Sequence, residues 1–148
     1  MKSLPRLAVL AVNLLLVFAF SGVYASSEDF GDYRVHYNAF NSDMLSPQIA
    51  QTYDIKRSSY RGVLNIAVQR QGQNGYRAVP AKVDGYATNL AGQLKRIEFQ
   101  EVREGEAIYY IGQFWIANRD ILNFRINVTP EAEKRAFPIQ FQQQFYTD

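Results

Sequence analysis

Few residues of this chain could carry out catalysis. The 148-residue sequence has no cysteine and a single histidine, His36. Thiolate nucleophiles and thiolate metal sites are therefore excluded, and a metal site built on one histidine would need several converging carboxylates. A serine triad would need a serine and an acid beside His36, but this residue alternates with Val35 and Tyr37 as an outward strand residue does. We therefore expect a non-catalytic protein without a metal or cofactor.

Carboxylates offer the one alternative route to enzyme chemistry. Between residues 95 and 106 four glutamates are interleaved with three cations: Glu98, Glu101, Glu104 and Glu106 with Lys95, Arg96 and Arg103. Such mixing is typical of a solvated hairpin. A carboxylate pair could still hydrolyse a glycosidic bond, so a small periplasmic hydrolase with an unrecognised carboxylate site remains an alternative.

A first candidate binding surface lies in and just after the stretch YNAFNSDMLSPQIAQTYDIKRSS, residues 37–59, where strand-like alternation stops. Its polar members are Asn38, Asn41, Arg57, Ser58 and Arg61. Two cations that flank hydroxyls can bind a carboxylate or phosphate, although exposed cations also pair with surface acids for little energy.

The same stretch has a structural interpretation. Ser46-Pro47 is a helix start, because serine caps a free N–H and proline fits the first turn. Ile49, Ala50 and Tyr53 then follow at helical spacing. We expect this helix to cover an open end of the fold, with Met44 and Leu45 beneath it.

A second candidate surface is the segment AIYYIGQFWIA, residues 107–117, which is apolar at both alternating sets of positions. Tyr109 and Trp115 share one parity, and Tyr110 and Phe114 share the other. Either an aromatic row is exposed and contacts a protein or sugar, or this strand is buried on both faces or lies in a dimer interface.

Most of these candidate residues lie on or beside predicted strands. Period-two alternation occurs in seven segments between turn signals such as Asn74-Gly75; the segments are 33–37, 63–68, 79–90, 97–100, 107–117, 122–128 and 137–145. This pattern predicts an all-β fold: a single antiparallel β-sandwich, immunoglobulin-like, of about seven strands with one short helix. An eight-stranded ligand barrel is the main alternative. We expect Phe124, Ile126, Phe141 and Phe145 in the core.

The N-terminus resembles a secretory signal. Lys2 and Arg6 precede an apolar run, and small residues end at Ala25, so we expect residues 1–25 to be a signal peptide and 26–148 the β-sandwich domain. The run is too short for a transmembrane anchor. Residues 26–148 hold 14 basic and 14 acidic residues, so their net charge is zero and does not favour nucleic acid or an anionic membrane.

The motifs NAFNS, Y-x-I-x-R-S and RG-x-LNI-x-V, with the FWI strand and the P-I-x-F-x-Q-x-F ending, support a family relationship. Over essentially all of residues 26–148 the chain resembles a family of small exported proteobacterial proteins catalogued as a domain of unknown function, DUF4426. The resemblance implies an exported one-domain sandwich and no reaction. We therefore expect a non-catalytic periplasmic binding module whose partner is another periplasmic protein, with an exported enzyme inhibitor as a special case.

The export hypothesis makes a direct prediction. The mature protein should begin at Ser26 and be released in the periplasmic fraction, because the signal would be cut after Ala25. N-terminal sequencing of that fraction checks it. Recovery of the chain in membranes with residues 1–25 still attached would contradict the prediction.

Overall fold

The computed structural model describes residues 26–148, so the predicted signal peptide lies outside the described residues. Within this range no helix has the length and apolar character needed to cross a membrane. The elements are β1 (Ser26–Phe30), β2 (Tyr33–Asn41), the 3₁₀ turn η1 (Ser42–Met44), α2 (Pro47–Thr52), β3 (Arg61–Gly72), β4 (Gly75–Ala78), β5 (Ala81–Thr88), β6 (Leu94–Ile97), β7 (Phe99–Glu104), β8 (Ala107–Trp115), β9 (Ile121–Pro130) and β10 (Phe137–Gln144).

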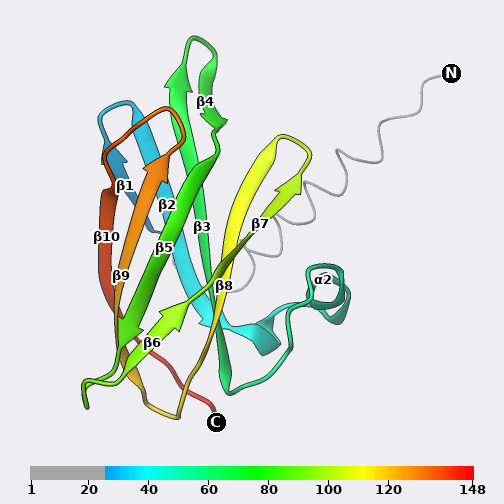
Figure 1. Cartoon of the computed structure of the whole chain (residues 1–148). Helices are drawn as coiled ribbons and strands as arrows, with labels where there is room; N and C mark the ends of the chain where they lie inside the picture. The colour runs from blue at the N-terminus through cyan, green and yellow to red at the C-terminus, as the bar shows by residue number, and fades with distance from the viewer. Residues whose placement is uncertain (1–25) are drawn as a thin grey trace, which may run out of the picture.

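The strands form two antiparallel sheets (Figure 1). One sheet has six strands in the order β1-β2-β3-β8-β7, with β4 also paired to β3, and the other has the order β10-β9-β5-β6. The antiparallel β-sandwich is thus confirmed, and it is immunoglobulin-like in the broad sense of two packed antiparallel sheets. The described chain has ten strands rather than about seven. The additional ones are β1, β4 and the separate β6. Their sequences, SSEDF, GYRA and LKRI, show no sustained alternation of apolar and polar residues, so the pattern did not reveal them.

The chain changes sheets between Ile97 and Phe99, which sequence alternation had placed in one strand. Ile97 ends β6 in the four-stranded sheet, and Phe99 begins β7 in the six-stranded sheet. This crossing passes over Gly112 of β8, where an added Cβ would lie 2.3 Å from the Ile97 side chain. Glycine at this position therefore allows the two sheets to meet closely.

The main core lies between the two sheets. Phe124, Ile126 and Phe145 are almost fully buried, as expected, while Phe141 is only partly buried. The Phe124 ring stacks on Phe141 with centroids 4.6 Å apart and meets Phe114 edge to face at 5.3 Å. These aromatic contacts hold β8, β9 and β10 together.

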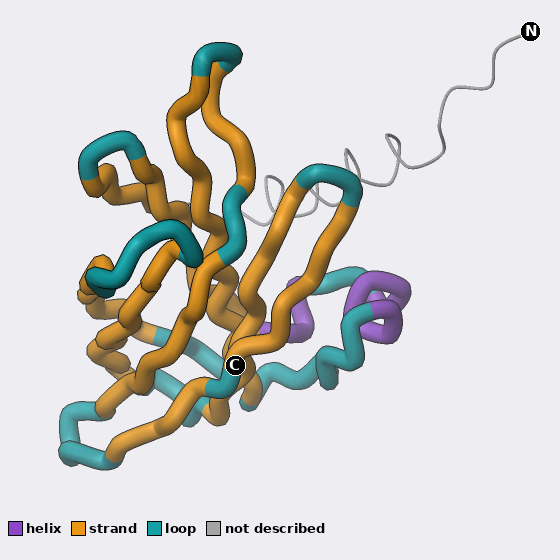
Figure 2. Tube along the Cα trace, turned by 45° about the horizontal axis from the view of Figure 1, so that its top comes forward, coloured by secondary structure: helices purple, strands orange, loops and turns teal. Residues whose placement is uncertain are grey.

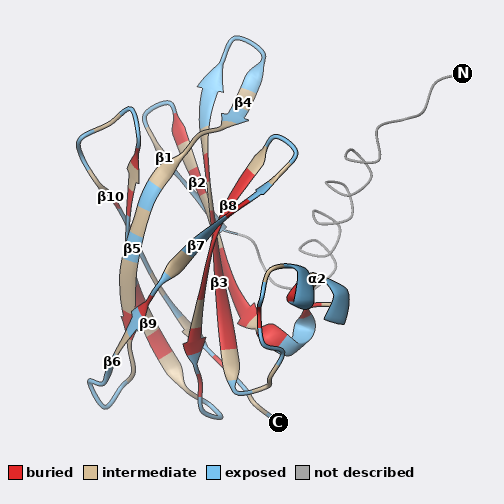
Figure 3. Ribbon diagram, turned by 45° about the vertical axis from the view of Figure 1, so that its right-hand side comes forward, coloured by how far each residue is buried: buried red, intermediate tan, exposed pale blue. Residues whose placement is uncertain are grey.

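The six-stranded sheet carries a second, smaller core on its outer face (Figure 3). The sheet contributes Phe40, Val63, Val102, Tyr109 and Ile111. They are covered by residues 42–57, here called the cover segment, which contributes the buried side chains of Leu45, Ala50 and Ile55. Strand β8 is therefore buried on both faces over most of its length, which explains its apolar sequence.

The cover segment lies on a sheet face and not at the open end of the sandwich, which corrects our expectation. In Figures 1 and 3, α2 lies on the side of β3 and β8 that is remote from β9 and β10. Leu45 is buried as expected, but Met44 is 45% exposed. The apolar outer residues of β3 and β8 need cover, and this requirement decides where the helix packs.

The predicted helix start is confirmed. Ser46 is the N-cap and its hydroxyl accepts a hydrogen bond from the Ile49 N–H (3.2 Å), with Pro47 in the first turn. The helix ends at Thr52. Asp54 then adopts a left-handed φ of 54°, which turns the chain so that the Ile55 N–H donates to the Ala50 carbonyl at 2.7 Å.

Phe124→Ala tests the main core. It should lower the free energy of unfolding by about 3–5 kcal/mol, because it removes a buried ring and leaves a cavity among three other aromatic rings. Urea denaturation measures this change. Phe141→Ala is the matched control and should cost less, since that ring is partly exposed; a Phe124→Ala loss below about 1 kcal/mol would contradict the assignment.

Candidate functional site

Two of the candidate polar residues, Arg57 and Ser58, serve the structure around the cover segment. Arg57 donates from Nε to the Leu45 carbonyl (2.7 Å) and from Nη2 to the Asp43 carbonyl (3.0 Å). The Ser58 N–H donates to the hydroxyl of Ser42, and that hydroxyl in turn donates to the Ser58 carbonyl at 3.1 Å. These bonds close the loop of the cover segment on itself, so Arg57 is engaged with backbone oxygens of the protein.

The two asparagines of that set also point to internal roles. Asn41 donates through Nδ2 to the Tyr146 carbonyl at 2.6 Å and so ties the C-terminal residues to the end of β2. Asn38 is only 8% exposed and lies opposite Asn65, whose buried Oδ1 has no hydrogen-bond partner among residues 26–148. His36, on the same outer face, is half-buried with Nε2 2.8 Å from Gln69 Oε1.

The structure separates Tyr109 from Trp115. Tyr109 is 8% exposed and belongs to the core under the cover segment, whereas Trp115 is 58% exposed. Burial raises the pKa of the Tyr109 phenol, with a further contribution from Glu104. An exposed Tyr109–Trp115 row is therefore wrong, because the cover segment reaches Tyr109 but stops short of the end of β8.

Arg61 and Trp115, from the two candidate sets, come together. They are register partners on β3 and β8, and the guanidinium lies over the indole ring at 4.2 Å from its centroid. Arg61 Nη1 also donates to Gln113 Oε1 at 3.2 Å. The Arg61 Nε is buried without a hydrogen-bond partner within the described range. We call Arg61, Gln113 and Trp115 the tryptophan corner.

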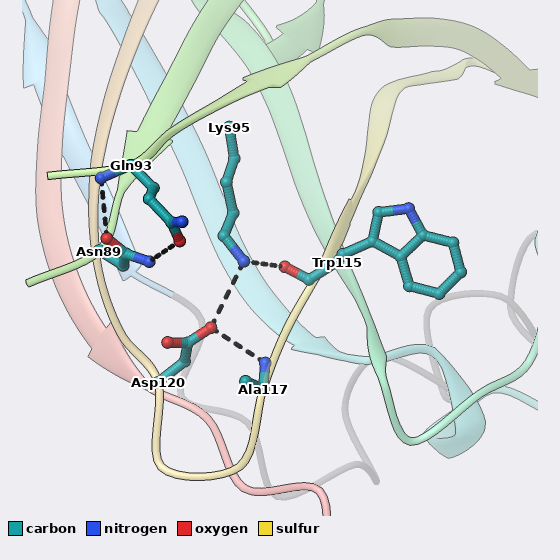
Figure 4. Close-up of polar contacts among 6 residues, drawn as sticks. All are labelled: Asn89, Gln93, Lys95, Trp115, Ala117 and Asp120. Atoms are coloured by element: carbon teal, nitrogen blue, oxygen red, sulfur yellow. Dashed lines mark hydrogen bonds and ion pairs between the residues drawn. The ribbon is translucent and has the colours of Figure 1, made fainter. Parts of the chain in front are cut away.

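The backbone of the tryptophan corner is held from the other sheet (Figure 4). Lys95 Nζ, on β6, donates to the Trp115 carbonyl at 2.6 Å and lies 3.4 Å from Asp120 Oδ2. The same carboxylate oxygen accepts from the Ala117 N–H at 2.9 Å. Figure 4 shows the indole directed away from this cluster. The ion pair is largely shielded from solvent, so it fixes the end of β8 while the ring faces outward.

The β5–β6 turn that presents Lys95 is itself clamped. Asn89 Oδ1 accepts from the Gln93 N–H at 2.9 Å, and Asn89 Nδ2 donates to Gln93 Oε1 at 2.8 Å. A shallow depression of about 440 Å³ opens beside the corner. It is lined by Lys95, Arg96, Glu98, Gln113, Phe114 and Trp115. Its polar lining includes two cations and one carboxylate, so it suits a polar or acidic group next to an aromatic ring.

Large exposed apolar side chains gather at this end of the sandwich. Besides Trp115 they are Tyr60, Leu90, Leu94 and Tyr146. The Tyr60 carbonyl accepts a hydrogen bond from the Ile116 N–H, next to Trp115. Leu90 lies in the β5–β6 turn, and Leu94 lies on β6 beside Lys95, which bonds the Trp115 carbonyl. The described part of the chain has one other exposed large apolar side chain, Met44. Five of these six side chains therefore belong to segments at the end of the sandwich that carries Trp115 (Figure 1).

The carboxylate alternative corresponds to a different depression. About 470 Å³ opens between the start of β5, β7 and the end of β9, with Glu101, Glu131 and Glu133 in its wall. Hydrogen bonds from Arg103 and then Tyr110 lower the pKa of Glu101, so this group is ionised at neutral pH. A general acid needs a raised pKa. Residues 26–148 also contain no group of three or more histidine or acidic residues placed to hold a metal ion.

Sequence reasoning found Arg61 and Trp115 but missed Gln113 and Lys95. Gln113 is the one non-aromatic polar side chain of β8 and shares the parity of Trp115, which is a signal available in the sequence. Lys95 was placed on a solvated hairpin. Its bond to Trp115 joins strands of different sheets, and alternation within one strand holds no information on that contact.

The fold and the corner define a two-sheet antiparallel sandwich that holds an exposed tryptophan rigidly at one end. The chain belongs to the DUF4426 family, a domain of unknown function, whose model matches residues 27–148. It is similar to the crystal structure of a DUF4426 family protein from Pseudomonas aeruginosa PAO1, with 36% identity and a TM-score of 0.74 over 87% of this chain and 98% of that one. The family resemblance expected from the motifs is thereby confirmed. No curated protein matches the chain.

Tyr53 links the cover segment to β7 and gives a pH prediction. Its hydroxyl donates to Glu104 Oε2, and burial, followed by this carboxylate, raises the pKa of Tyr53 to about 12. The fold therefore favours the neutral phenol. The stabilisation is complete below the ordinary pKa of 10.0 and is lost as pH rises from there toward 12.

We expect the free energy of unfolding to fall between about pH 10 and pH 12, and Tyr53→Phe to make this fall shallower. Urea denaturation at several pH values measures both slopes. Some slope should persist in the variant, since burial also raises the pKa of Tyr110. Identical slopes for the variant and the unaltered protein would show that Tyr53 does not couple the cover segment to Glu104.

Proposed function

We propose that this protein is a non-catalytic periplasmic binding module that captures another protein through the tryptophan corner. The observation that carries the proposal is the exposed Trp115 ring held over Arg61, whose buried Nε lacks a partner within residues 26–148. Tryptophan, tyrosine and arginine dominate the energetic centres of protein interfaces. Here all three residue types stand together, since Tyr60 directly precedes Arg61 and is 56% exposed.

Rigidity supports the proposal as well. The Lys95 and Asp120 contacts fix the backbone at Trp115, and Arg61 supports one side of its ring. A preorganised aromatic anchor loses little conformational entropy when a partner covers it, which favours binding. An exported enzyme inhibitor would be one form of such a module. The hydrogen bond from Arg103 lowers the pKa of Glu101, so this residue does not suit the general-acid role that a hydrolase at that groove would need.

Site-specific cross-linking in intact cells tests the proposal. A photoreactive amino acid at position 60 should yield a discrete adduct, and the identified partner, once purified, should bind the unaltered protein. Trp115→Ala should weaken that binding by roughly 30-fold or more, as truncation of an interface anchor does. Arg61→Ala should act in the same direction through loss of the stacked cation.

Tyr76→Ala is the matched control. Tyr76 also carries a stacked guanidinium, that of Arg34 at 4.4 Å, but it lies on β4 at the other end of the sandwich (Figure 1). This control should leave binding unchanged. Equal affinity of the Trp115→Ala and Tyr76→Ala variants for the partner, with unfolding midpoints unaltered, would overturn the proposal.

A further inference from the structure

The outer face of the four-stranded sheet is rich in amide side chains. Alternate residues of β9 and β10 point into the core, so the remaining ones point outward. Five of these outward residues are amides: Asn123, Asn127, Gln140, Gln142 and Gln144. No segment of the described chain covers them in the way that residues 42–57 cover the other sheet, and in Figure 2 the helices all lie on the opposite side of the molecule.

A row of four side chains crosses the whole sheet at the centre of this face. Tyr86 on β5 is the register partner of Arg96 on β6 and of Arg125 on β9, and Arg125 in turn pairs with Gln140 on β10. Partner residues on one face of an antiparallel sheet have Cβ atoms about 5 Å apart. The two arginines therefore flank the tyrosine, with their strands about 10 Å from each other.

Neither arginine of this row is neutralised within the protein. Arg96 and Arg125 form no ion pair or side-chain hydrogen bond with residues 26–148, and both are exposed. Three arginines of the other sheet have carboxylate partners: Arg34 with Asp29, Arg70 with Asp32, and Arg103 with Glu101.

Asp84 is the one carboxylate among the outward positions of these four strands, and it reaches neither guanidinium. Lys82 adds a third cation, so the face is positive although the described chain has equal numbers of acidic and basic residues. Arg96 and Arg125 have no counter-charge within the described chain, so a negatively charged ligand would find two unpaired guanidinium groups on this face.

The rest of the face indicates which anionic ligand fits. Amide side chains both donate and accept hydrogen bonds, as sugar hydroxyls require. Gln142 Nε2 donates to Asn123 Oδ1 at 2.9 Å, which orients the two amides and leaves the Gln142 oxygen and the Asn123 nitrogen available. The Tyr86 ring offers an apolar surface with a polar edge for a sugar ring. Three cations are few for nucleic acid, whose binding depends on many phosphate contacts.

We propose that the outer face of the four-stranded sheet binds an acidic polysaccharide. Arg96 and Arg125 hold two acidic groups of the sugar chain, Tyr86 contacts the ring between them, and the amides of β9 and β10 bond hydroxyls along the chain. This surface is separate from the Trp115 ring and adds a second ligand to the protein-binding role proposed above; Arg96 borders both surfaces.

Isothermal titration of the purified protein with polygalacturonate fragments tests this inference, with methyl-esterified fragments as the uncharged match. We expect binding of the acidic form, weaker with rising salt, and at least tenfold weaker binding of the ester. Arg125→Gln should weaken binding at least fivefold, and Tyr86→Ala should do the same. Arg125→Lys should fall between, since lysine keeps the charge but loses the two-pronged donor geometry.

Arg77→Gln is the matched control, because Arg77 is an exposed strand arginine of the other sheet, on β4. It should leave the affinity unchanged. Absence of binding, equal binding of the ester, or equal losses for Arg77→Gln and Arg125→Gln would overturn the inference. Tighter binding of duplex DNA than of polygalacturonate would also overturn it, in favour of a nucleic-acid surface.

Discussion

The structure depends on burying both faces of the six-stranded sheet. Neighbouring residues of β3 and β8, such as Val63 and Leu64 or Tyr109 and Tyr110, are buried on opposite faces. The second sheet can cover only one of these faces. The other requires the cover segment, whose helix is too short to be stable unless it packs on this apolar surface. The position of α2 and the serine and arginine bonds that close the segment follow from this requirement.

The extent of the cover also decides what is left outside. The cover segment reaches Tyr109 and Ile111 but not the end of β8. Trp115 lies on the same face as Ile111, four residues further along the strand, and is therefore exposed. Its carbonyl is bonded by Lys95 from the opposite sheet. That bond is possible because the chain changes sheets over Gly112, which brings β6 against β8. The exposure and the rigidity of the tryptophan corner thus come from the same packing that stabilises the sandwich.

Sequence periodicity predicted the features that depend on a single segment, such as which residues of a strand face the core. The alternation of β9 and β10 identified Phe124, Ile126 and Phe145 as core residues, and Ser46-Pro47 marked the helix start correctly. Contacts between distant segments could not be predicted in this way. Whether α2 covers an end or a face depends on which strands become neighbours, and the pairing of Arg61 with Trp115 depends on the register of β3 and β8. Residues 107–117 are apolar at both alternating sets of positions. This pattern could not distinguish an exposed aromatic row from a strand buried on both faces, because it does not show which segment covers the strand.

The two sheets differ in how they use their outer faces, and this difference bears on the class of function. The cover segment closes the central part of the outer face of the six-stranded sheet and leaves Trp115 outside it, whereas the outer face of the four-stranded sheet is open and carries the Arg96–Tyr86–Arg125 row. Both exposed features sit on strands, so backbone pairing fixes their spacing before any ligand arrives. Catalysis on a sandwich usually relies on long loops that enclose a substrate. Flat or projecting strand surfaces instead favour recognition of an extended partner, because many weak contacts can form at once without closure around a reacting group. A protein bound at Trp115 and a sugar chain lying across Tyr86 would contact opposite sheets, and the domain could then hold the two together.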